Sequence, residues 1–307
     1  MITRDIASFL QSAAAAAPDF GPSTARAAFM VAPDGFQLAE QSAADNRYMA
    51  TADGFDAARA SAQHRELQRA ISQVLPTVCF AGDPATPDAL FPNNVFGTAR
   101  VDGKARYVLG RMRHPVRQRE AGRADIQDFF GKVLGYEAVD LSTQPHPCEL
   151  TGALVIDRAR GIAFAGLSER CDEEGARLMH DAFGLRATLM FDLAAGEYHT
   201  NVVLAVLAGR AAVICPQGFA DPTAVDAIAS LYAPHAIELA PAEHAAFAGN
   251  CIALSEDRVW MSGQAGRSLL PATRTAFAAA GFSVDTVELD AIEAGGGSLR
   301  CCIGEIF

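Results

Sequence analysis

The sequence FPNNVFGTARVDGKARYVLGRM occupies residues 91–112, and three later stretches repeat its pattern. They are ELTGALVIDRARGIAFAGLSER at 149–170, YHTNVVLAVLAGRAAVICPQGF at 198–219 and GNCIALSEDRVWMSGQ at 249–264. In each stretch a small or polar motif precedes an apolar run, a turn with charged residues or glycine, and a second run. This pattern is typical of a β-hairpin. Helical stretches follow the four hairpins, at 125–135, 172–184, 221–233 and 271–281.

Polar residues near the start of these stretches recur about every fifty residues. The positions are Asn94, Glu149, His199 and Asn250, and Cys301 continues the series. A repeat of this length, made of strand-rich units, is typical of a propeller. Because equivalent positions of such repeats converge on the axis, we expect Asn94, Glu149, His199 and Cys301 to lie together at one end of a central channel.

The N-terminal part differs from the rest of the chain. Residues 1–26 are rich in alanine, serine and proline and carry little patterned hydrophobicity, which predicts a flexible arm without chemistry. From Ala27 the sequence contains short buried strands, RAAFMV at 26–31 and TVCF at 77–80. We therefore expect residues 27–307 to form a single α/β domain.

Composition and charge exclude several classes of function. The chain has 307 residues, 50% of them hydrophobic and 20% charged, enough to bury a large core. Its net charge of -11 argues against nucleic acid, which requires clustered lysine and arginine. No run approaches the roughly 18 apolar residues of a membrane span, and the N-terminus lacks a signal-peptide pattern. We expect a cytoplasmic protein with no membrane partner.

The seven cysteines predict reduced thiols rather than a disulfide framework, because they are odd in number and thinly spread. They contain no C-x-x-C pair, and no H-x-x-x-H motif accompanies them, so no metal or other cofactor is indicated. Cys301 follows GGGSLR at 295–300, where three glycines indicate a close approach of the backbone to a ligand. A histidine such as His199 can activate such a thiol, and Glu149 can accept hydrogen bonds from a substrate.

These motifs resemble those of the guanidino-group-modifying, or pentein, superfamily. The resemblance extends from Ala27 to the end of the sequence, and five motifs carry it in the order and spacing of the family. They are FPNN at 91–94, ELTG at 149–152 with LSER at 167–170, YHTN at 198–201, GN at 249–250 and GGGSLRC at 295–301. The superfamily includes arginine deiminases, dimethylarginine dimethylaminohydrolases and amidinotransferases. The resemblance implies a five-bladed α/β propeller.

The FPNN, YHTN and GGGSLRC motifs are most similar to those of bacterial citrulline-utilising hydrolases. The resemblance implies that Cys301 attacks the central carbon of the substrate, that His199 acts as general acid and then base, and that Glu149 binds substrate nitrogens. It also implies that Arg113 and Arg170 bind the α-carboxylate of an amino-acid substrate. An arginine fork suits that task.

Two asparagines bear on the substrate. Family enzymes that act on guanidinium typically have aspartate where Asn94 and Asn201 stand here. A buried carboxylate stabilises a cation but is uncompensated against a neutral ureido group, whereas an amide can both donate and accept hydrogen bonds. The two asparagines favour citrulline, which complete hydrolysis would convert to ornithine, ammonia and carbon dioxide.

Other functions stay open at this point. The resemblance also allows an arginine deiminase, an arginine dihydrolase or a dimethylarginine dimethylaminohydrolase. A non-enzymatic propeller is known in a ribosome anti-association factor, but such a protein has no need of Cys, His and Glu in register. A papain-like protease places its cysteine before its histidine, the reverse of the order here. The chain could also form a homodimer.

Overall fold

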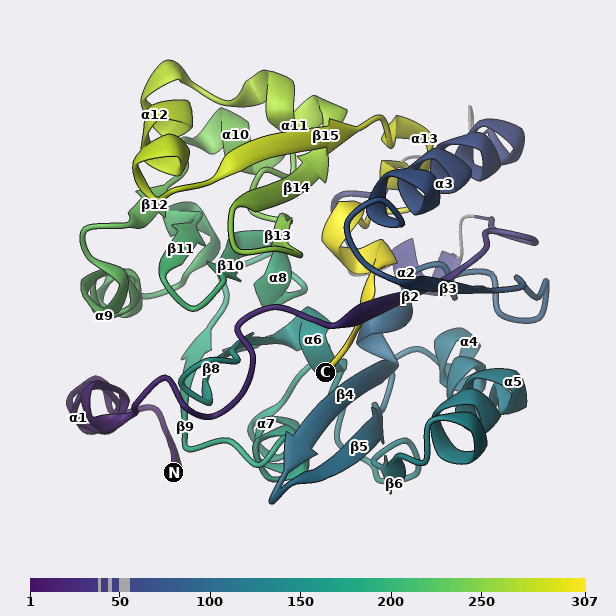
Figure 1. Ribbon diagram of the computed structural model, residues 1–307, viewed down its shortest axis with the longest axis horizontal. Coiled ribbons are helices and arrows are strands. Elements are labelled where there is room, and N and C mark those ends of the chain that lie inside the picture. Colours follow the sequence, from purple (N-terminus) through teal and green to yellow (C-terminus); the bar gives the residue numbers. More distant parts are fainter. Residues whose placement is uncertain (38–39, 44–45, 50–55) are drawn as a thin grey trace.

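The computed structural model describes residues 1–37, 40–43, 46–49 and 56–307. It contains five small sheets that surround the centre of the molecule (Figure 1). This arrangement agrees with the α/β propeller that the fifty-residue repeat predicts.

All five sheets, or blades, share one topology. The first strand pairs antiparallel with the second, and the second pairs parallel with the third. In chain order the blades are β4 (Phe96–Val101), β5 (Lys104–Leu109) and β6 (Glu137–Asp140); β7 (Leu154–Asp157), β8 (Ile162–Leu167) and β9 (Ala187–Asp192); β10 (Leu204–Leu207), β11 (Ala211–Ile214) and β12 (Ala236–Glu238); β13 (Ile252–Ala253), β14 (Arg258–Ser262) and β15 (Ser283–Val287); and β16 (Gly304–Ile306), β2 (Ala27–Val31) and β3 (Thr77–Phe80).

Tight turns close the predicted hairpins. Asp102 and Gly103 have φ values of 51° and 78°, and Ala208 and Gly209 have 48° and 67°. Two successive residues with positive φ are the mark of a type I′ turn, whose twist matches that of the strands it joins. The turn chemistry therefore fixes the register of the inner two strands in these blades.

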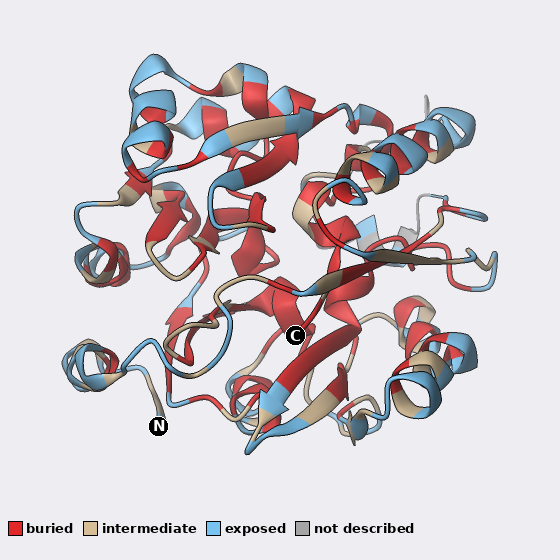
Figure 2. Cartoon of the chain, viewed as in Figure 1, coloured by how far each residue is buried: buried red, intermediate tan, exposed pale blue. Residues whose placement is uncertain are grey.

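A helix on the outside of each blade leads into its third strand. The outer helices are α3 (Ala57–Ile71), α5 (Ala124–Asp128) continued by η3 (Phe129–Val133), α7 (Glu173–Ala182), α9 (Pro222–Tyr232) and α12 (Pro271–Ala279). Figure 2 shows these helices buried on the side that faces the sheets and exposed on the other. The four helices expected after the hairpins are present, and the predicted strand at 77–80 is β3, but the sequence pattern did not predict the third strands of the other four blades.

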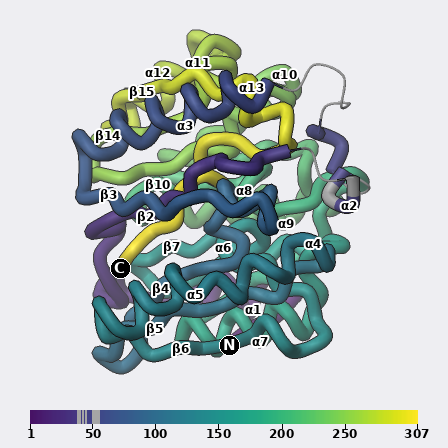
Figure 3. The backbone as a smooth tube through the Cα atoms, turned by 90° about the vertical axis from the view of Figure 1, so that its right-hand side faces the viewer, coloured from purple at the N-terminus to yellow at the C-terminus, as the bar shows by residue number. Residues whose placement is uncertain are grey.

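The fifth blade joins distant parts of the chain. Strand β16 pairs antiparallel with β2, with Gly304 opposite Phe29 and Ile306 opposite Ala27. The two segments run side by side in both views of the backbone (Figures 1 and 3). This pairing closes the ring of blades and fixes the segment that immediately precedes β16, which carries Cys301.

The N-terminal segment is packed in the structure, although we expected a flexible arm. Strand β1 (Ile2–Thr3) pairs parallel with β9 and widens that blade to four strands. Helix α1 (Ile6–Ala15) buries Phe9 completely, with its ring 5.7 Å from that of Phe164 in an edge contact. A boundary at residue 27 between an arm and a single domain stays a prediction.

Short helices complete the connections between blades. They are α2 (Glu40–Ala43), α4 (Pro115–Gln118), η2 (Arg119–Gly122), η4 (Pro216–Gly218), α10 (Pro241–Ala245), α11 (Gly263–Ser268) and α13 (Asp290–Glu293). Within the four described ranges, no helix has both the length and the apolar character needed to cross a bilayer.

Candidate active site

Short helical turns at the centre of the molecule carry the residues that recur in the sequence. They are η1 (Pro92–Asn94), α6 (Leu150–Ala153), α8 (Thr200–Val203) and η5 (Leu299–Cys302). Each turn lies immediately before the first strand of a blade or one residue away from it. The sequence pattern predicted the strands but not these turns. Glu149 and His199 are the residues immediately before α6 and α8. The blades therefore bring these side chains together as the repeat predicted.

His199, Glu149 and Arg170 form a buried polar chain. The Nε2 atom of His199 lies 2.7 Å from Oε2 of Glu149, and Nη1 of Arg170 lies 3.5 Å from the same oxygen. The other carboxylate oxygen accepts a hydrogen bond of 3.0 Å from the backbone N–H of Arg113. Glu149 is completely buried, so these contacts replace its hydration.

The contacts among these three side chains and their burial set the charge of Glu149 and of His199. Burial disfavours the charged form of Glu149, but Arg170 and the hydrogen bond from His199 outweigh it and hold the pKa of the carboxyl well below its usual range. Burial lowers the pKa of His199, although Glu149 opposes this shift. At neutral pH the geometry thus combines an ionised Glu149 with a neutral imidazole whose Nε2 proton points to the carboxylate.

Cys301 lies in η5, and its side chain contacts two asparagines. Its Sγ atom is 3.4 Å from Nδ2 of Asn250 and 3.9 Å from Nδ2 of Asn201. Burial raises the pKa of the Cys301 thiol, and hydrogen bonds from the backbone and from Asn250 reduce that rise. The resting side chain is therefore a protonated thiol with amide donors already aimed at the sulfur.

A cavity lies over these groups, and the empty space inside it, counted together with the open solvent at its mouth, is about 310 Å³. Four of the predicted site residues line it, namely Asn94, Arg170, His199 and Cys301. Two buried polar atoms here, Oδ1 of Asn94 and Nδ1 of His199, have no hydrogen-bond partner among the described residues. A buried polar atom without a partner is costly, which favours a ligand that supplies one. We call this space the front cavity.

The remaining predicted residues lie outside the lining of the front cavity. Glu149 is behind His199. Arg113 directs Nη1 to Oε2 of Glu169, 2.5 Å away near the surface. Asn201 donates from Nδ2 to the carbonyl of Thr151 at 3.1 Å and reaches the site through Cys301 instead. The structure therefore brings Arg113 and Asn201 next to the site but gives neither a place in the lining.

The lining residues that the sequence analysis missed include Asp88 and Arg117. Arg117 makes two hydrogen bonds to the carboxylate of buried Glu120, at 2.8 and 2.9 Å, and one to the carbonyl of Phe91 at 3.1 Å. It thereby holds the segment before Asn94 in place. Neither residue falls on the fifty-residue repeat, but the acidic residue three positions before Phe91 was an available signal.

Gly152 makes the close approach of the central side chains possible. A Cβ atom at this position would lie 2.4 Å from Oδ1 of Asn94 and 2.8 Å from Cε1 of His199. No real Cβ atom tolerates such contacts. The glycine therefore lets Asn94 and His199 meet at the floor of the front cavity.

Comparison with known proteins identifies the family. A family model described as "N,N dimethylarginine dimethylhydrolase, eukaryotic" matches residues 32–307. The chain belongs to this family. Family membership confirms the predicted placement among the guanidino-modifying enzymes, and the protein is an enzyme that hydrolyses non-peptide carbon–nitrogen bonds. No curated protein sequence matches the chain.

Solved structures share the fold of this dimethylarginine dimethylhydrolase family member. The N-terminal domain of ArgZ with bound substrate, an arginine dihydrolase from the ornithine–ammonia cycle in cyanobacteria, has a TM-score of 0.78 at 19% identity over 91% of this chain and 97% of its own. Unliganded AgrE has a TM-score of 0.78 at 22% identity, over 92% of this chain and 39% of its own. An adduct of dimethylarginine dimethylaminohydrolase with S-methyl-L-thiocitrulline has a TM-score of 0.67 at 19% identity, over 92% of this chain and 100% of its own. These likenesses confirm the five-bladed pentein fold.

Proposed function

We propose that this protein is a cysteine-dependent hydrolase of a small ureido or guanidino amino acid, with citrulline as its substrate. The observation that carries the proposal is the front cavity, where Cys301, His199 and Asn94 surround one space and Glu149 holds the imidazole from behind. This is the combination of nucleophile, base and orienting group that covalent catalysis requires.

Cys301 is the nucleophile and His199 moves the protons. With Nε2–H donated to Glu149, Nδ1 of His199 carries the lone pair and accepts the thiol proton. The Sγ–C bond to the ureido carbon forms, the C–N bond to the terminal nitrogen breaks, and ammonia leaves with the proton from His199. Water, deprotonated by His199, then displaces the thiolate. The resulting N-carboxyornithine loses carbon dioxide and leaves ornithine.

Glu149 and Arg170 support this proton transfer. An imidazolium forms in each half of the reaction, and the ionised carboxylate 2.7 Å from Nε2 stabilises it. Arg170 lines the cavity and provides positive charge for the α-carboxylate of the substrate. Arg113 and Asn201 act indirectly. The backbone N–H of Arg113 donates a hydrogen bond to Glu149, and the side chain of Asn201 contacts Cys301.

Asn94 supports citrulline as the substrate. Its Oδ1 atom is a buried acceptor without a partner among the described residues, and a ureido N–H supplies the missing donor. The amide is neutral, so it matches a neutral ureido group without leaving a charge unpaired.

Arginine is the second candidate, and Asp88 favours it. This buried carboxylate lines the front cavity and adds negative charge that a guanidinium would offset. The similarity to the arginine dihydrolase ArgZ points the same way.

The choice between the two is tested by a single substitution. We expect the wild-type protein to release ornithine from citrulline, and Asn94→Asp to lower the ratio of kcat/KM for citrulline to kcat/KM for arginine at least about tenfold, because the new carboxylate favours the cation. Ammonia release and product masses are measured with citrulline, arginine and dimethylarginine. Wild-type turnover of arginine with none of citrulline would overturn the citrulline proposal and leave the hydrolase intact.

Gly152→Ala tests whether the front cavity is the site of reaction. The added methyl group forces Asn94 and His199 apart, and a displacement of this size costs about 10²-fold in kcat/KM. The matched control is Gly122→Ala, where a Cβ atom meets nothing within 4 Å. Equal activity of the two variants in the same ammonia assay would place the reaction elsewhere.

A further inference from the structure

A second cavity, which we call the back cavity, lies on the other side of the central turns. The chain passes from His199 at the front cavity through Asn201 in α8 to Leu204 on β10, and both Asn201 and Leu204 line the back cavity. The empty space inside it, counted together with the open solvent at its mouth, is about 520 Å³. Neither Cys301, His199 nor Asn94 belongs to its lining, so this space is separate from the proposed site of reaction.

The wall of the back cavity combines apolar side chains with polar atoms, which make up the larger share of its exposed surface. It is made by the first strands of three blades, with Leu154 and Ile156 on β7, Leu204 on β10 and Ile252 on β13. Inner strands of a propeller usually fill such a space with their own side chains. Here the side chains leave a narrow space between apolar side chains and two arginines.

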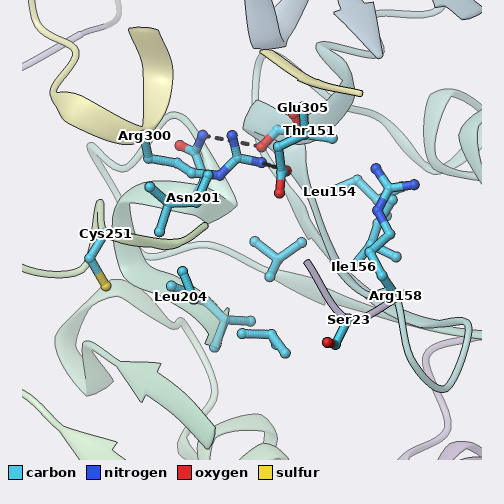
Figure 4. Close-up of a pocket in the computed structure, with 15 residues that line it drawn as sticks. Ser23, Thr151, Leu154, Ile156, Arg158, Asn201, Leu204, Cys251, Arg300 and Glu305 are labelled. Carbon is cyan, nitrogen blue, oxygen red and sulfur yellow. Dashed lines mark hydrogen bonds and ion pairs between the residues drawn. The ribbon is translucent and has the colours of Figure 1, made fainter. Parts of the chain in front are cut away.

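Two arginines reach the back cavity from opposite sides (Figure 4). Arg300 is fully engaged, because Nη2 pairs with Glu305 at 2.8 Å and Nη1 donates to the carbonyl of Ile303 at 3.1 Å. Arg158 donates one hydrogen bond of 3.0 Å to the carbonyl of Thr98. The two arginines therefore differ in how their charge is compensated.

Arg158 carries a charge that no carboxylate among the described residues pairs with. Its guanidinium lies over the rings of Phe307 and Phe183, at 4.2 and 5.3 Å from their centroids. Burial lowers the pKa of Arg158 to about 10, Glu305 opposes the shift, and Arg300 adds to it. A partly buried cation without a carboxylate partner is a recognition element for an anion.

We propose that the back cavity binds a short-chain organic carboxylate. The carboxylate group pairs with Arg158, and the hydrocarbon chain packs against Leu154, Leu204 and Ile252. The bound molecule contacts Asn201, whose amide is 3.9 Å from Sγ of Cys301, and so lies directly beneath the floor of the front cavity.

Calorimetric titration with butyrate at constant ionic strength tests this proposal. We expect saturable binding to the wild-type protein, with butyrate binding more tightly than acetate because its chain buries apolar surface. Arg158→Gln weakens butyrate binding at least about tenfold, the expected loss of a charge-assisted hydrogen bond. Arg100→Gln is the matched control, because Arg100 shares a neighbouring pocket with Arg158 but does not line the back cavity.

Two further variants keep the result interpretable if Arg158→Gln is poorly folded. Ala205→Leu fills the back cavity while Arg158 remains, and it should abolish butyrate binding. Asn94→Leu changes the front cavity alone and should leave the affinity unchanged. Absence of saturable binding to the wild-type protein, unchanged binding to Ala205→Leu, or loss of binding in Asn94→Leu would each overturn the proposal.

Discussion

Replacing Cys301 by serine lowers kcat at least about 10⁴-fold and leaves the fold intact. The loss is large because the hydroxyl is a far weaker nucleophile than the thiol. The fold is retained because serine is smaller than cysteine and keeps the contacts to Asn250 and Asn201. The measurement is ammonia release in steady state, together with the urea midpoint of unfolding.

The neighbouring cysteine provides the matched control. Cys302 is fully buried, its Sγ atom faces the carbonyl of Ser298 at 3.6 Å, and it does not line the front cavity. Cys302→Ser should keep kcat within about threefold of the wild-type value. Turnover that survives in Cys301→Ser but disappears in Cys302→Ser would show that Cys302, and not Cys301, is the nucleophile.

Glu149→Gln combines a loss of activity with a loss of stability. The substitution keeps the shape of the side chain but removes the charge that His199 and Arg170 share. We expect kcat to fall about 10² to 10⁴-fold and the free energy of unfolding to fall by about 3 kcal/mol, because a buried arginine loses its carboxylate. Urea unfolding and ammonia release measure the two effects.

The stability effect depends on pH in a defined direction. The pKa of Glu149 is lower in the folded protein than its ordinary value of 4.5, so the carboxylate stabilises the fold above pH 4.5 and that contribution is lost as the pH falls. The difference in unfolding free energy between wild type and Glu149→Gln should therefore be largest near neutral pH and shrink in acid. Glu169→Gln, whose carboxylate is exposed, serves as control and should change stability by less than about 0.5 kcal/mol. A difference between wild type and Glu149→Gln that grows in acid would contradict the assigned direction.

The repeat in the sequence was sufficient to predict the propeller and the clustering of Asn94, Glu149, His199 and Cys301. The physical reason is that blades of equal length return the chain to the axis at equal intervals. The fifth blade escaped this pattern because its strands come from β16 and β2, at opposite ends of the chain. A repeat interrupted in this way has no contiguous copy to compare.

The third strands β6 and β12 escaped prediction for a different reason. Strand β6 has the sequence EAVD and is mostly exposed, and β12 consists of AIE. Such outer strands carry polar residues and are too short for an alternating pattern to be recognised. Their position follows from the parallel pairing with β5 and β11, which is a tertiary property.

The N-terminal segment shows where local composition misleads. Alanine-rich sequence carries little hydrophobic pattern, yet Ala13 and Phe9 are both buried against the third blade and its neighbour. Small side chains allow close packing of a helix, so a weak pattern is compatible with a buried face.

Asp88 and Arg117 were missed because their role depends on where the front cavity opens, which the spacing of residues does not encode.

The pairing of β16 with β2 has a consequence for the order of synthesis. The ribosome synthesises β2 early, but β16 (Gly304–Ile306), the antiparallel partner of β2, is synthesised only after the other four blades. Until then the edge of β2 has no β16 to cover it, and Cys301, immediately upstream of that partner, has no frame to hold it against Asn250. Cys301 is thus synthesised after the strands of the other four blades, so a nascent chain that has not yet reached it is unable to react with the metabolites around it.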